Sequence, residues 1–473
     1  TYGKGGQVIM VIAAYLGEAK FRDGVRRHLS AHAYGNARGE DFFNALAQAA
    51  GDPRIVDAMK SFVEQQGVPL ITLTGGNGHY TVSQSRYVRL GSQAPDVRWT
   101  VPLCMRRDGA RECTLLDAKE APIAIDGSGP VLPNAGGTGY YRFELPTPQW
   151  DALIATADRL PSGEAQAVAD SLRASFKAGR ATPGQLIDLA RKLADNPDSY
   201  ALAESGETLS LLSDGAVLDK RAAAALRQLA AGIYGPKLAA LGFDPARGIY
   251  DGADPQISAR RETLVSYLAF MAEDGALRKT LAQAARAYLK GEAAALDPAF
   301  MSMALNIYIA QGGRAEAEDL AERALSSQDP VFRPVALAAL NKKGDPDIAR
   351  WLLDGLRDDR LRATERLRVL SDVFDEDATR DFAQSWLGRN YDALVKEYGG
   401  NFVLGTLPGM FSDFCSRDGA DRLQRQYAAR FAGTPGELSF ARALEAARDC
   451  AVLTRARGKE MRAAVLATAR SQP

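Results

Sequence analysis

The chain has 473 residues, too many for one ordinary hydrophobic core, so two to four domains are expected. Its composition, 46% hydrophobic and 25% charged, is typical of a soluble globular protein. Lys plus Arg and Asp plus Glu both number 58, and this zero formal net charge argues against nucleic acid as a general partner.

The start of the chain has the pattern of a folded element rather than of a leader. It begins at Thr1, not Met, and no signal peptide is visible. No apolar run reaches the roughly 18 residues that predict a membrane span. We therefore expect that Thr1 marks a cut in a longer protein and that this chain does not cross a membrane.

Residues 1–68 have the pattern of several helices. Residues 8–14 are apolar on all sides, which predicts a helix buried on every face. Asp52-Pro53 suits the cap and first turn of another helix, and Gly67 suits a left-handed stop after it. The pattern predicts a helical segment at the start of the chain.

Residues 69–147 change to a strand pattern. Apolar residues alternate with polar ones from Val97 to Leu103, and residues 114–116 and 140–143 are further strand candidates. Turn signals rich in Gly and Asp separate them. Short strands at this spacing predict a small β-sandwich.

Residues 148–473 are rich in Ala, Leu and Arg at helical spacing. Asp-Pro pairs at Asp297, Asp329 and Asp345 each predict the start of a new helix. These units resemble the stacked helix pairs of HEAT- or armadillo-like α-solenoids, although no strict repeat motif is found. The fold class expected for the whole chain is therefore multidomain and mainly α.

Two cysteines lie opposite each other in a predicted hairpin. Counting outward from the two-residue turn Asp108-Gly109 pairs Arg107 with Ala110 and, three steps further, Cys104 with Cys113. The pairs alternate in type, so this one is a non-hydrogen-bonded pair, whose Cα atoms come within disulfide range. A Cys104–Cys113 bond is favoured over the alternative of two free thiols in a core strand.

A second bridge between neighbouring helices could join Cys415 and Cys450. Disulfides of this kind would imply an oxidising compartment.

The three histidines do not form a recognisable metal site. His28 and His32 have the four-residue spacing of a zincin helix, but Leu29 stands where the catalytic Glu is needed and no third ligand is evident. His79 lies in a turn rich in Gly and Asn. We expect no metal to be bound by this chain.

The glycine-rich segments are interpreted as turns. Residues 75–78 and 136–137 lack the strand-to-helix context that phosphate binding requires. The serines follow no Gly-x-Ser-x-Gly pattern. No cofactor site is therefore predicted.

Several motifs follow one another in a fixed order along the first 145 residues. They are Tyr2-Gly3-Lys4-Gly5-Gly6 before an apolar helix, His32-Ala33-Tyr34-Gly35-Asn36-Ala37, Asp41-Phe42-Phe43, Gln66-Gly67-Val68-Pro69 and Asn134-Ala135-Gly136-Gly137-Thr138-Gly139-Tyr140-Tyr141-Arg142. This series resembles the aminopeptidase N and puromycin-sensitive aminopeptidase family of zinc peptidases (gluzincins). Beyond residue 145 only the helical architecture and short segments such as Gly388-Arg389-Asn390-Tyr391 agree.

The resemblance implies a division into three domains. Residues 1–68 would be the last helices of a thermolysin-like catalytic domain, residues 69–147 a β-sandwich domain and residues 148–473 a helical C-terminal cap. The His-Glu-x-x-His…Glu zinc site would then precede Thr1, so zinc belongs to the full-length parent and not to this fragment.

One catalytic residue carries over from the family, Tyr2. The family's tyrosine at this position directs its hydroxyl at the substrate carbonyl oxygen. A neutral donor of this kind can stabilise an oxyanion without titrating near neutral pH. The alternative is that Tyr2 is an aromatic residue that caps the helix.

The function implied is that of a zinc aminopeptidase acting on peptide substrates, with this fragment inactive alone. Its partner would be the missing N-terminal and catalytic portion of the same protein. A periplasmic or secreted location is expected, with the cytoplasm as the alternative. The alternative function is a non-catalytic helical-repeat module, with an appended β-sandwich, that binds peptides or proteins.

Overall fold

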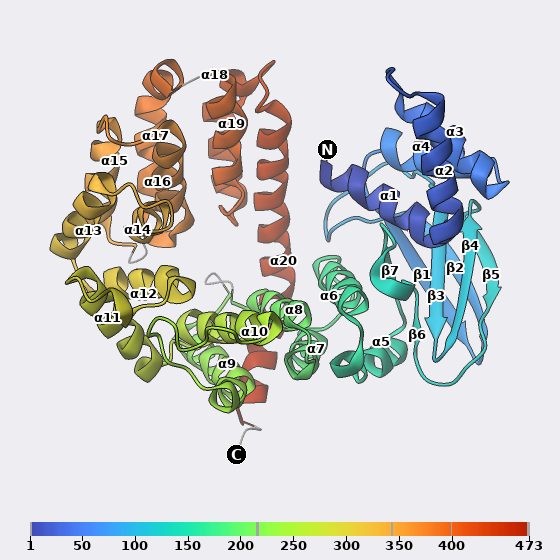
Figure 1. The fold of residues 1–473 in the computed structure, drawn as a ribbon, viewed down its shortest axis with the longest axis horizontal. Helices are drawn as coiled ribbons and strands as arrows, with labels where there is room; N and C mark the ends of the chain where they lie inside the picture. Colours follow the sequence, from blue (N-terminus) through green and yellow to red (C-terminus); the bar gives the residue numbers. More distant parts are fainter. Residues whose placement is uncertain (1, 214–216, 342–343, 399, 471–473) are drawn as a thin grey trace. The chain divides into compact units, whose positions relative to one another are not determined.

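The computed structural model describes residues 2–213, 217–341, 344–398 and 400–470. The chain divides into two compact units, Thr1–Asp214 and Gly215–Pro473 (Figure 1). Helices dominate both units and a small β region lies in the first, so the fold is multidomain and mainly α, as predicted. The domain boundaries at residues 68 and 147 stay a prediction.

Four helices open the first unit: α1 (Tyr2–Leu16), α2 (Glu18–Ala31), α3 (Gly39–Ala50) and α4 (Arg54–Glu64). Helix α2 packs closely on α3 at Gly24, where an added Cβ would lie 2.7 Å from Leu46 Cδ2. The start predicted at Asp52-Pro53 is displaced by one residue: α4 begins at Arg54 with Pro53 at its N-cap, and Asp52 Oδ1 accepts a hydrogen bond from the Arg54 amide (3.0 Å). Gly67 has the predicted left-handed backbone, with φ 104°.

The β region contains two sheets. One has the strand order β5-β2-β1-β7 and the other β4-β3-β6. Strand β7 runs parallel to β1, whereas the other pairs are antiparallel. The strands are β1 (Pro69–Gly76), β2 (His79–Arg86), β3 (Val101–Arg107), β4 (Ala110–Leu116), β5 (Glu120–Ala124), β6 (Val131–Leu132) and β7 (Arg142–Glu144).

The strand expected from Val97 to Leu103 begins later, at Val101. The Gln84 side chain takes the place of a neighbouring strand at Trp99. Its Oε1 accepts from the Trp99 amide (2.9 Å) and its Nε2 donates to the Trp99 carbonyl (2.8 Å). Trp99 is 1% exposed. The alternating pattern therefore predicted a buried position at Trp99 correctly, although this part of the chain is not a strand.

The hairpin of β3 and β4 has the predicted register. Arg107 lies opposite Ala110 and Cys104 opposite Cys113. Asp108 has φ 53°, the positive value that the first central residue of a primed turn needs. Counting outward from the turn was therefore sufficient to pair these strands.

Helices occupy the rest of both units. In the first unit they are α5 (Thr147–Ile154), α6 (Ser162–Lys177), α7 (Pro183–Asp195) and α8 (Ser199–Ser210). In the second they are α9 (Lys220–Leu241), α10 (Pro255–Ser266), α11 (Gly275–Leu289), α12 (Pro298–Gln311), α13 (Arg314–Ser326), α14 (Phe332–Ala339), α15 (Pro346–Asp354), α16 (Ala363–Asp375), α17 (Asp377–Tyr398), α18 (Gly400–Thr406), α19 (Arg417–Phe431) and α20 (Glu437–Arg470). Short η helices, of the 3-10 type except η3, are η1 (Ala135–Gly137), η2 (Ala157–Arg159), η3 (Tyr267–Met271), η4 (Ala293–Ala295), η5 (Gly355–Arg357) and η6 (Leu407–Phe411).

The second unit is built from helices that pack on their neighbours in the chain. Helix α11 packs on α12, α13 on α14, α16 on α17 and α19 on α20. Asp297 and Asp345 cap α12 and α15 as predicted, and Asp329 accepts from two amides at the start of α14. The long helix α20 also packs on α9, where Arg462 pairs with Asp219 at 3.4 Å.

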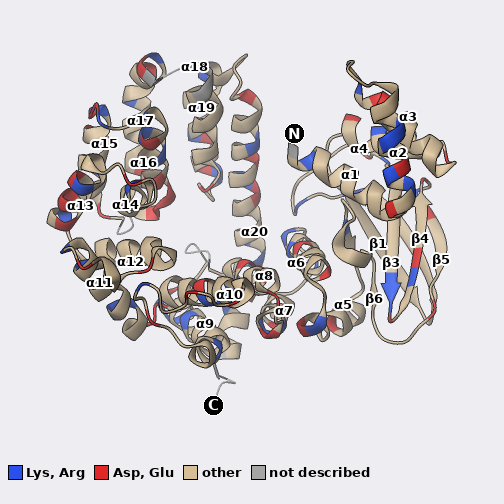
Figure 2. Ribbon diagram, viewed as in Figure 1, with Lys and Arg blue, Asp and Glu red and all other residues tan. Residues whose placement is uncertain are grey.

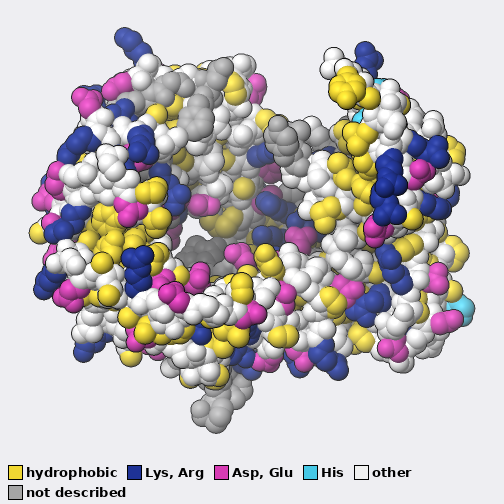
Figure 3. Space-filling view, viewed as in Figure 1, with side chains coloured by type: hydrophobic (Ala, Val, Ile, Leu, Met, Phe, Trp, Pro, Cys, Tyr) yellow, Lys and Arg dark blue, Asp and Glu magenta, His cyan; other side chains and the backbone are white. Residues whose placement is uncertain are grey.

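Basic and acidic residues are interspersed along the helices of both units (Figure 2). On the face shown in Figure 3 the two signs are likewise mixed with hydrophobic side chains. None of the helices in the described part of the chain has the length and apolar character that crossing a bilayer requires.

Candidate functional site

Helix α1 carries Tyr2 as its first residue. The side chain of Tyr2 lies outside the described residues, so its catalytic role stays a prediction. The helix itself is held at its N-terminal end by Lys4, whose Nζ donates to the Gln65 carbonyl (2.8 Å). Burial lowers the pKa of Lys4. Val8 and Ile12, at most 1% exposed, anchor the inner face.

The other end of α1 is held by the β3–β4 hairpin. Arg111 Nη2 donates to the Ala14 carbonyl (3.3 Å), and a cation at the C-terminal end of a helix is favoured by the helix dipole. Burial, together with the negative charge of Asp52, raises the pKa of Tyr15. With both ends fixed, the backbone of α1 is a rigid support for its first residue.

The outer face of α1 is apolar and exposed, contrary to the expectation of a helix buried on every side. Ile9 is 40% and Met10 49% exposed, although Val8, Val11 and Ile12 are buried. An exposed apolar helix face of this kind is typical of a surface that another protein segment covers.

His28, on α2, and His32, which caps the C-terminal end of that helix, lie side by side with ring centroids 5.1 Å apart. Phe42 packs edge-on against His28 at 5.2 Å. Over the residues that the structure describes, no group of three or more His, Cys, Asp or Glu side chains could hold a metal ion. His79 is exposed at the start of β2. The described residues therefore do not fit a zinc site.

The glycine-rich segment before β7 forms a tight loop that holds α6 against the β region. Asn134 closes it, since its Oδ1 accepts from the Gly139 amide (2.8 Å) and its Nδ2 donates to the Gly139 carbonyl (3.1 Å). Gly137 has φ 67°, and a Cβ there would lie 1.9 Å from the Gly163 carbonyl oxygen. Only glycine fits this close approach between backbones.

Glu164 of α6 ties the same loop to β3. Its carboxylate accepts from Arg106 Nε (2.9 Å) and Nη2 (2.6 Å), a bidentate pair, and from the Gly136 amide (2.9 Å). The Glu164 side chain is 4% exposed and that of Arg106 33%. This half-buried ion pair connects loop, sheet and helix. Sequence reasoning missed it because Arg106 and Glu164 are 58 residues apart.

The four cysteines form the two predicted disulfides, Cys104–Cys113 and Cys415–Cys450. The first joins β3 to β4, with Cα atoms 4.1 Å apart. The second joins the segment before α19 to α20 across 35 residues. Each bond therefore links two neighbouring elements within one unit.

The redox state of the cysteines can be measured directly. We expect protein made in an oxidising compartment to show no reactive thiol after denaturation without reductant, and four thiols after reduction. The measurement is thiol titration with a chromogenic disulfide. Four free thiols before reduction would contradict both bonds.

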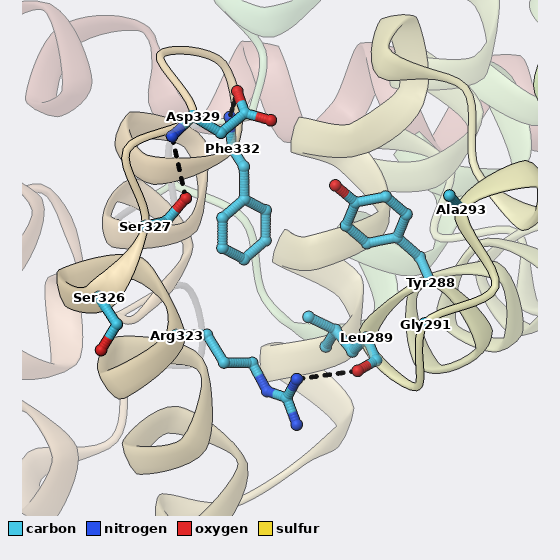
Figure 4. A pocket seen from close by; sticks show the side chains of 9 residues that line it. All are labelled: Tyr288, Leu289, Gly291, Ala293, Arg323, Ser326, Ser327, Asp329 and Phe332. Carbon is cyan, nitrogen blue, oxygen red and sulfur yellow. Dashed lines mark hydrogen bonds between the residues drawn. The ribbon is translucent and has the colours of Figure 1, made fainter.

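A cavity of about 460 Å³ lies in the second unit among the ends of α11 and α13 and the start of α14. Figure 4 shows the rings of Tyr288 and Phe332 on two sides of it; their centroids are 6.0 Å apart. Arg323 closes one end and donates to the Leu289 carbonyl (2.9 Å). Burial and the charge of Asp329 raise the pKa of Tyr288, so the phenol stays a neutral donor at neutral pH.

Two family models match the chain. The model described as the ERAP1-like C-terminal domain matches residues 130–451, and the peptidase family M1 domain model matches residues 1–65. The two matches follow each other along the chain and together cover most of it.

Several curated aminopeptidases are similar in sequence. Aminopeptidase M1-C of Oryza sativa subsp. japonica is 23% identical over 91% of this chain and 50% of its own length. Aminopeptidase M1 of Arabidopsis thaliana is 24% identical over 91% of this chain and 51% of its own length. Probable aminopeptidase 1 of Saccharolobus solfataricus is 34% identical over 30% of this chain and 18% of its own length. The chain spans about half the length of the relatives that match most of it.

Proposed function

The chain belongs to the family of ERAP1-like C-terminal domains, and we propose that it is the C-terminal part of a zinc aminopeptidase that removes N-terminal residues from peptides. The observation that carries this proposal is the match of residues 1–65 to the peptidase family M1 domain, which lies ahead of the match to the C-terminal family at residues 130–451. A non-catalytic helical module would account for the helices but not for this match. The enzyme is therefore favoured over the binding module.

In this proposal Tyr2 stabilises the transition state. Its phenol donates a hydrogen bond to the oxygen on which negative charge develops during peptide hydrolysis. The support is the fixed backbone of α1, held by Lys4 at one end and Arg111 at the other. A rigid donor costs little reorganisation when the charge appears.

Zinc in this proposal belongs to the complete protein, with ligands upstream of Thr1. When bound, zinc supplies a Lewis acid that polarises the peptide carbonyl and activates water. The exposed apolar face of α1, with Ile9 and Met10, supports a covering segment from the catalytic portion of the same protein. The partner of this chain is then its own N-terminal portion.

The helical region 148–473 is proposed to be the cap that encloses the peptide. Its basic and acidic residues are mixed, which suits peptides of varied sequence rather than peptides of one charge.

The two disulfides support an oxidising compartment, hence a periplasmic or secreted location rather than the cytoplasmic alternative.

The proposal is tested on the complete protein encoded by the gene. We expect it to release the N-terminal residue from aminoacyl-anilides and short peptides, to lose activity on chelation and to regain it with zinc. The sequence encoded upstream of Thr1 should contain His-Glu-x-x-His followed by a Glu. A complete protein that lacks this motif and cleaves none of these substrates would overturn the proposal.

The 473-residue chain alone is expected to be inert. The described residues bring no three metal ligands together, so the zinc content after dialysis should be close to zero. Metal analysis and an aminopeptidase assay on the purified chain are the measurements. Stoichiometric zinc accompanied by activity would contradict the assignment of the metal ligands to the missing portion.

A further inference from the structure

The hairpin disulfide has one accessible and one protected side. Cys113 is exposed on β4, which is the edge strand of its sheet. Cys104, on the central strand β3, is 6% exposed. Thiol–disulfide exchange requires access to the sulfur that is attacked, so a reductant can approach the bond at Cys113.

The protected sulfur lies beside a guanidinium group. Arg111 Nη2 is 3.6 Å from Cys104 Sγ. A nearby cation stabilises a thiolate, and a better stabilised thiolate leaves faster in exchange. Arg106 faces the same side of the hairpin as Arg111, but it is held in its bidentate pair with Glu164. Arg111 is therefore the cation placed to assist departure of Cys104.

The same nitrogen of Arg111 also donates to the Ala14 carbonyl at the end of α1 (3.3 Å). This guanidinium group thus connects the disulfide to the helix that begins at Tyr2. We propose that Cys104–Cys113 is a reducible site for dithiol reductants and that its opening loosens the C-terminal end of α1 through Arg111.

The exchange proceeds in two steps. A thiolate of the dithiol attacks Cys113 Sγ; the new S–S bond forms as the Cys104–Cys113 bond breaks, and Cys104 leaves with the electron pair as a thiolate beside Arg111. The second thiol of the reductant gives its proton to solvent and attacks the mixed disulfide, which releases Cys113. The protein disulfide gains two electrons, and the dithiol becomes a cyclic disulfide.

Opening changes what Arg111 binds. The full negative charge of the Cys104 thiolate attracts the guanidinium more strongly than a neutral disulfide sulfur or a peptide carbonyl does. The hydrogen bond to Ala14 weakens as a result. The last turn of α1, closed by the Gly17 amide bonding to the Ala13 carbonyl (3.0 Å), then loses its external support.

The test uses the native chain and dithiothreitol, with the Cys415–Cys450 bond of the same molecule as internal reference. Both cysteines of the reference bond are half-buried. Samples are quenched with iodoacetamide over time and analysed by peptide mass spectrometry. We expect Cys104 and Cys113 to become alkylated before the reference pair. Equal opening of the two bonds, or no opening of the hairpin bond, would overturn the proposal.

The role of Arg111 is tested by Arg111→Gln, with Arg107→Gln as the matched control that removes one charge from the other face of the same hairpin. We expect Arg111→Gln to slow opening of the hairpin bond on the order of threefold or more. Arg107→Gln should not slow it, and neither variant should change the rate at Cys415–Cys450. Because the reference bond lies in the second unit, retention of the fold in the first unit is checked separately by the urea unfolding midpoint of each variant. An unaltered hairpin rate in Arg111→Gln contradicts the assignment.

Coupling to α1 is measured by amide hydrogen exchange before and after selective reduction. Exchange should rise at residues 15–17 and stay constant in α3 (Gly39–Ala50), which is the reference helix. Exchange that remains unchanged at residues 15–17 after complete reduction would show that the bond is not coupled to α1.

Discussion

Replacing Glu164 by alanine is expected to lower the free energy of unfolding of the first unit by about 3 kcal/mol. The variant removes a carboxylate that is 4% exposed and leaves the Arg106 guanidinium without its bidentate partner. It also leaves the Gly136 amide without its acceptor. Removing the carboxylate is costly because the Arg106 guanidinium, 33% exposed, stays partly desolvated and the Gly136 amide loses its acceptor.

Urea unfolding followed by tryptophan fluorescence measures this effect, since Trp99 and Trp150 are both 1% exposed in the first unit. The matched control is Asp96→Ala, which removes a pair with Lys119 in which both side chains are more than 70% exposed. An exposed pair of this kind contributes about 0–1 kcal/mol. A Glu164→Ala midpoint equal to that of the control would show that the ion pair does not hold the loop.

The features that could be predicted from the sequence are those set by residues close together in the chain. The Asp108-Gly109 turn determines the register that brings Cys104 opposite Cys113. The Asp-Pro pairs at Asp297 and Asp345 supply a cap and a first-turn proline within two residues. Local signals of this kind do not depend on the rest of the fold.

The features that could not be predicted depend on partners far apart in the chain. The alternation at Val97 and Trp99 has the period of a strand, but the strand partner is replaced by the Gln84 side chain, 15 residues away. The glycine loop was identified as a motif, whereas its connection to Arg106 passes through Glu164 on another helix. Hydrophobic periodicity carries no information about these contacts.

In the candidate site, too, the local pattern could be predicted and the contacts between distant residues could not. The Tyr2-x-Lys4-Gly5 pattern indicated a functional tyrosine at the entry to a helix, and α1 (Tyr2–Leu16) covers these residues. The anchors of that helix at Gln65 and Arg111 have no sequence signal of their own. The all-apolar pattern of residues 8–14 also does not distinguish a face covered by this chain from the exposed face at Ile9 and Met10.

Tyr2→Phe in the complete enzyme is expected to lower kcat by about 10²–10³, or roughly 3–4 kcal/mol of transition-state stabilisation. The phenol hydroxyl is the only group removed, and the proposed hydrogen bond is made to charge that develops in the transition state. KM should therefore change little. Zinc should stay bound, because the proposed role of the hydroxyl does not include metal ligation.

Steady-state kinetics on an aminoacyl-anilide, with zinc analysis of the same preparations, measures these quantities. Tyr34→Phe is the matched control, because it removes the same hydroxyl from a fully exposed tyrosine in the loop after α2. We expect the control to keep kcat within about twofold of the parent, since substitution of an exposed side chain away from structural features has little effect.

Near-normal kcat in Tyr2→Phe would assign this tyrosine to helix capping. Loss of zinc together with activity would mean that the substitution disturbs the metal site. A fall in kcat alone, with KM, zinc content and the Tyr34→Phe control unchanged, is the outcome that a transition-state donor at the start of α1 requires.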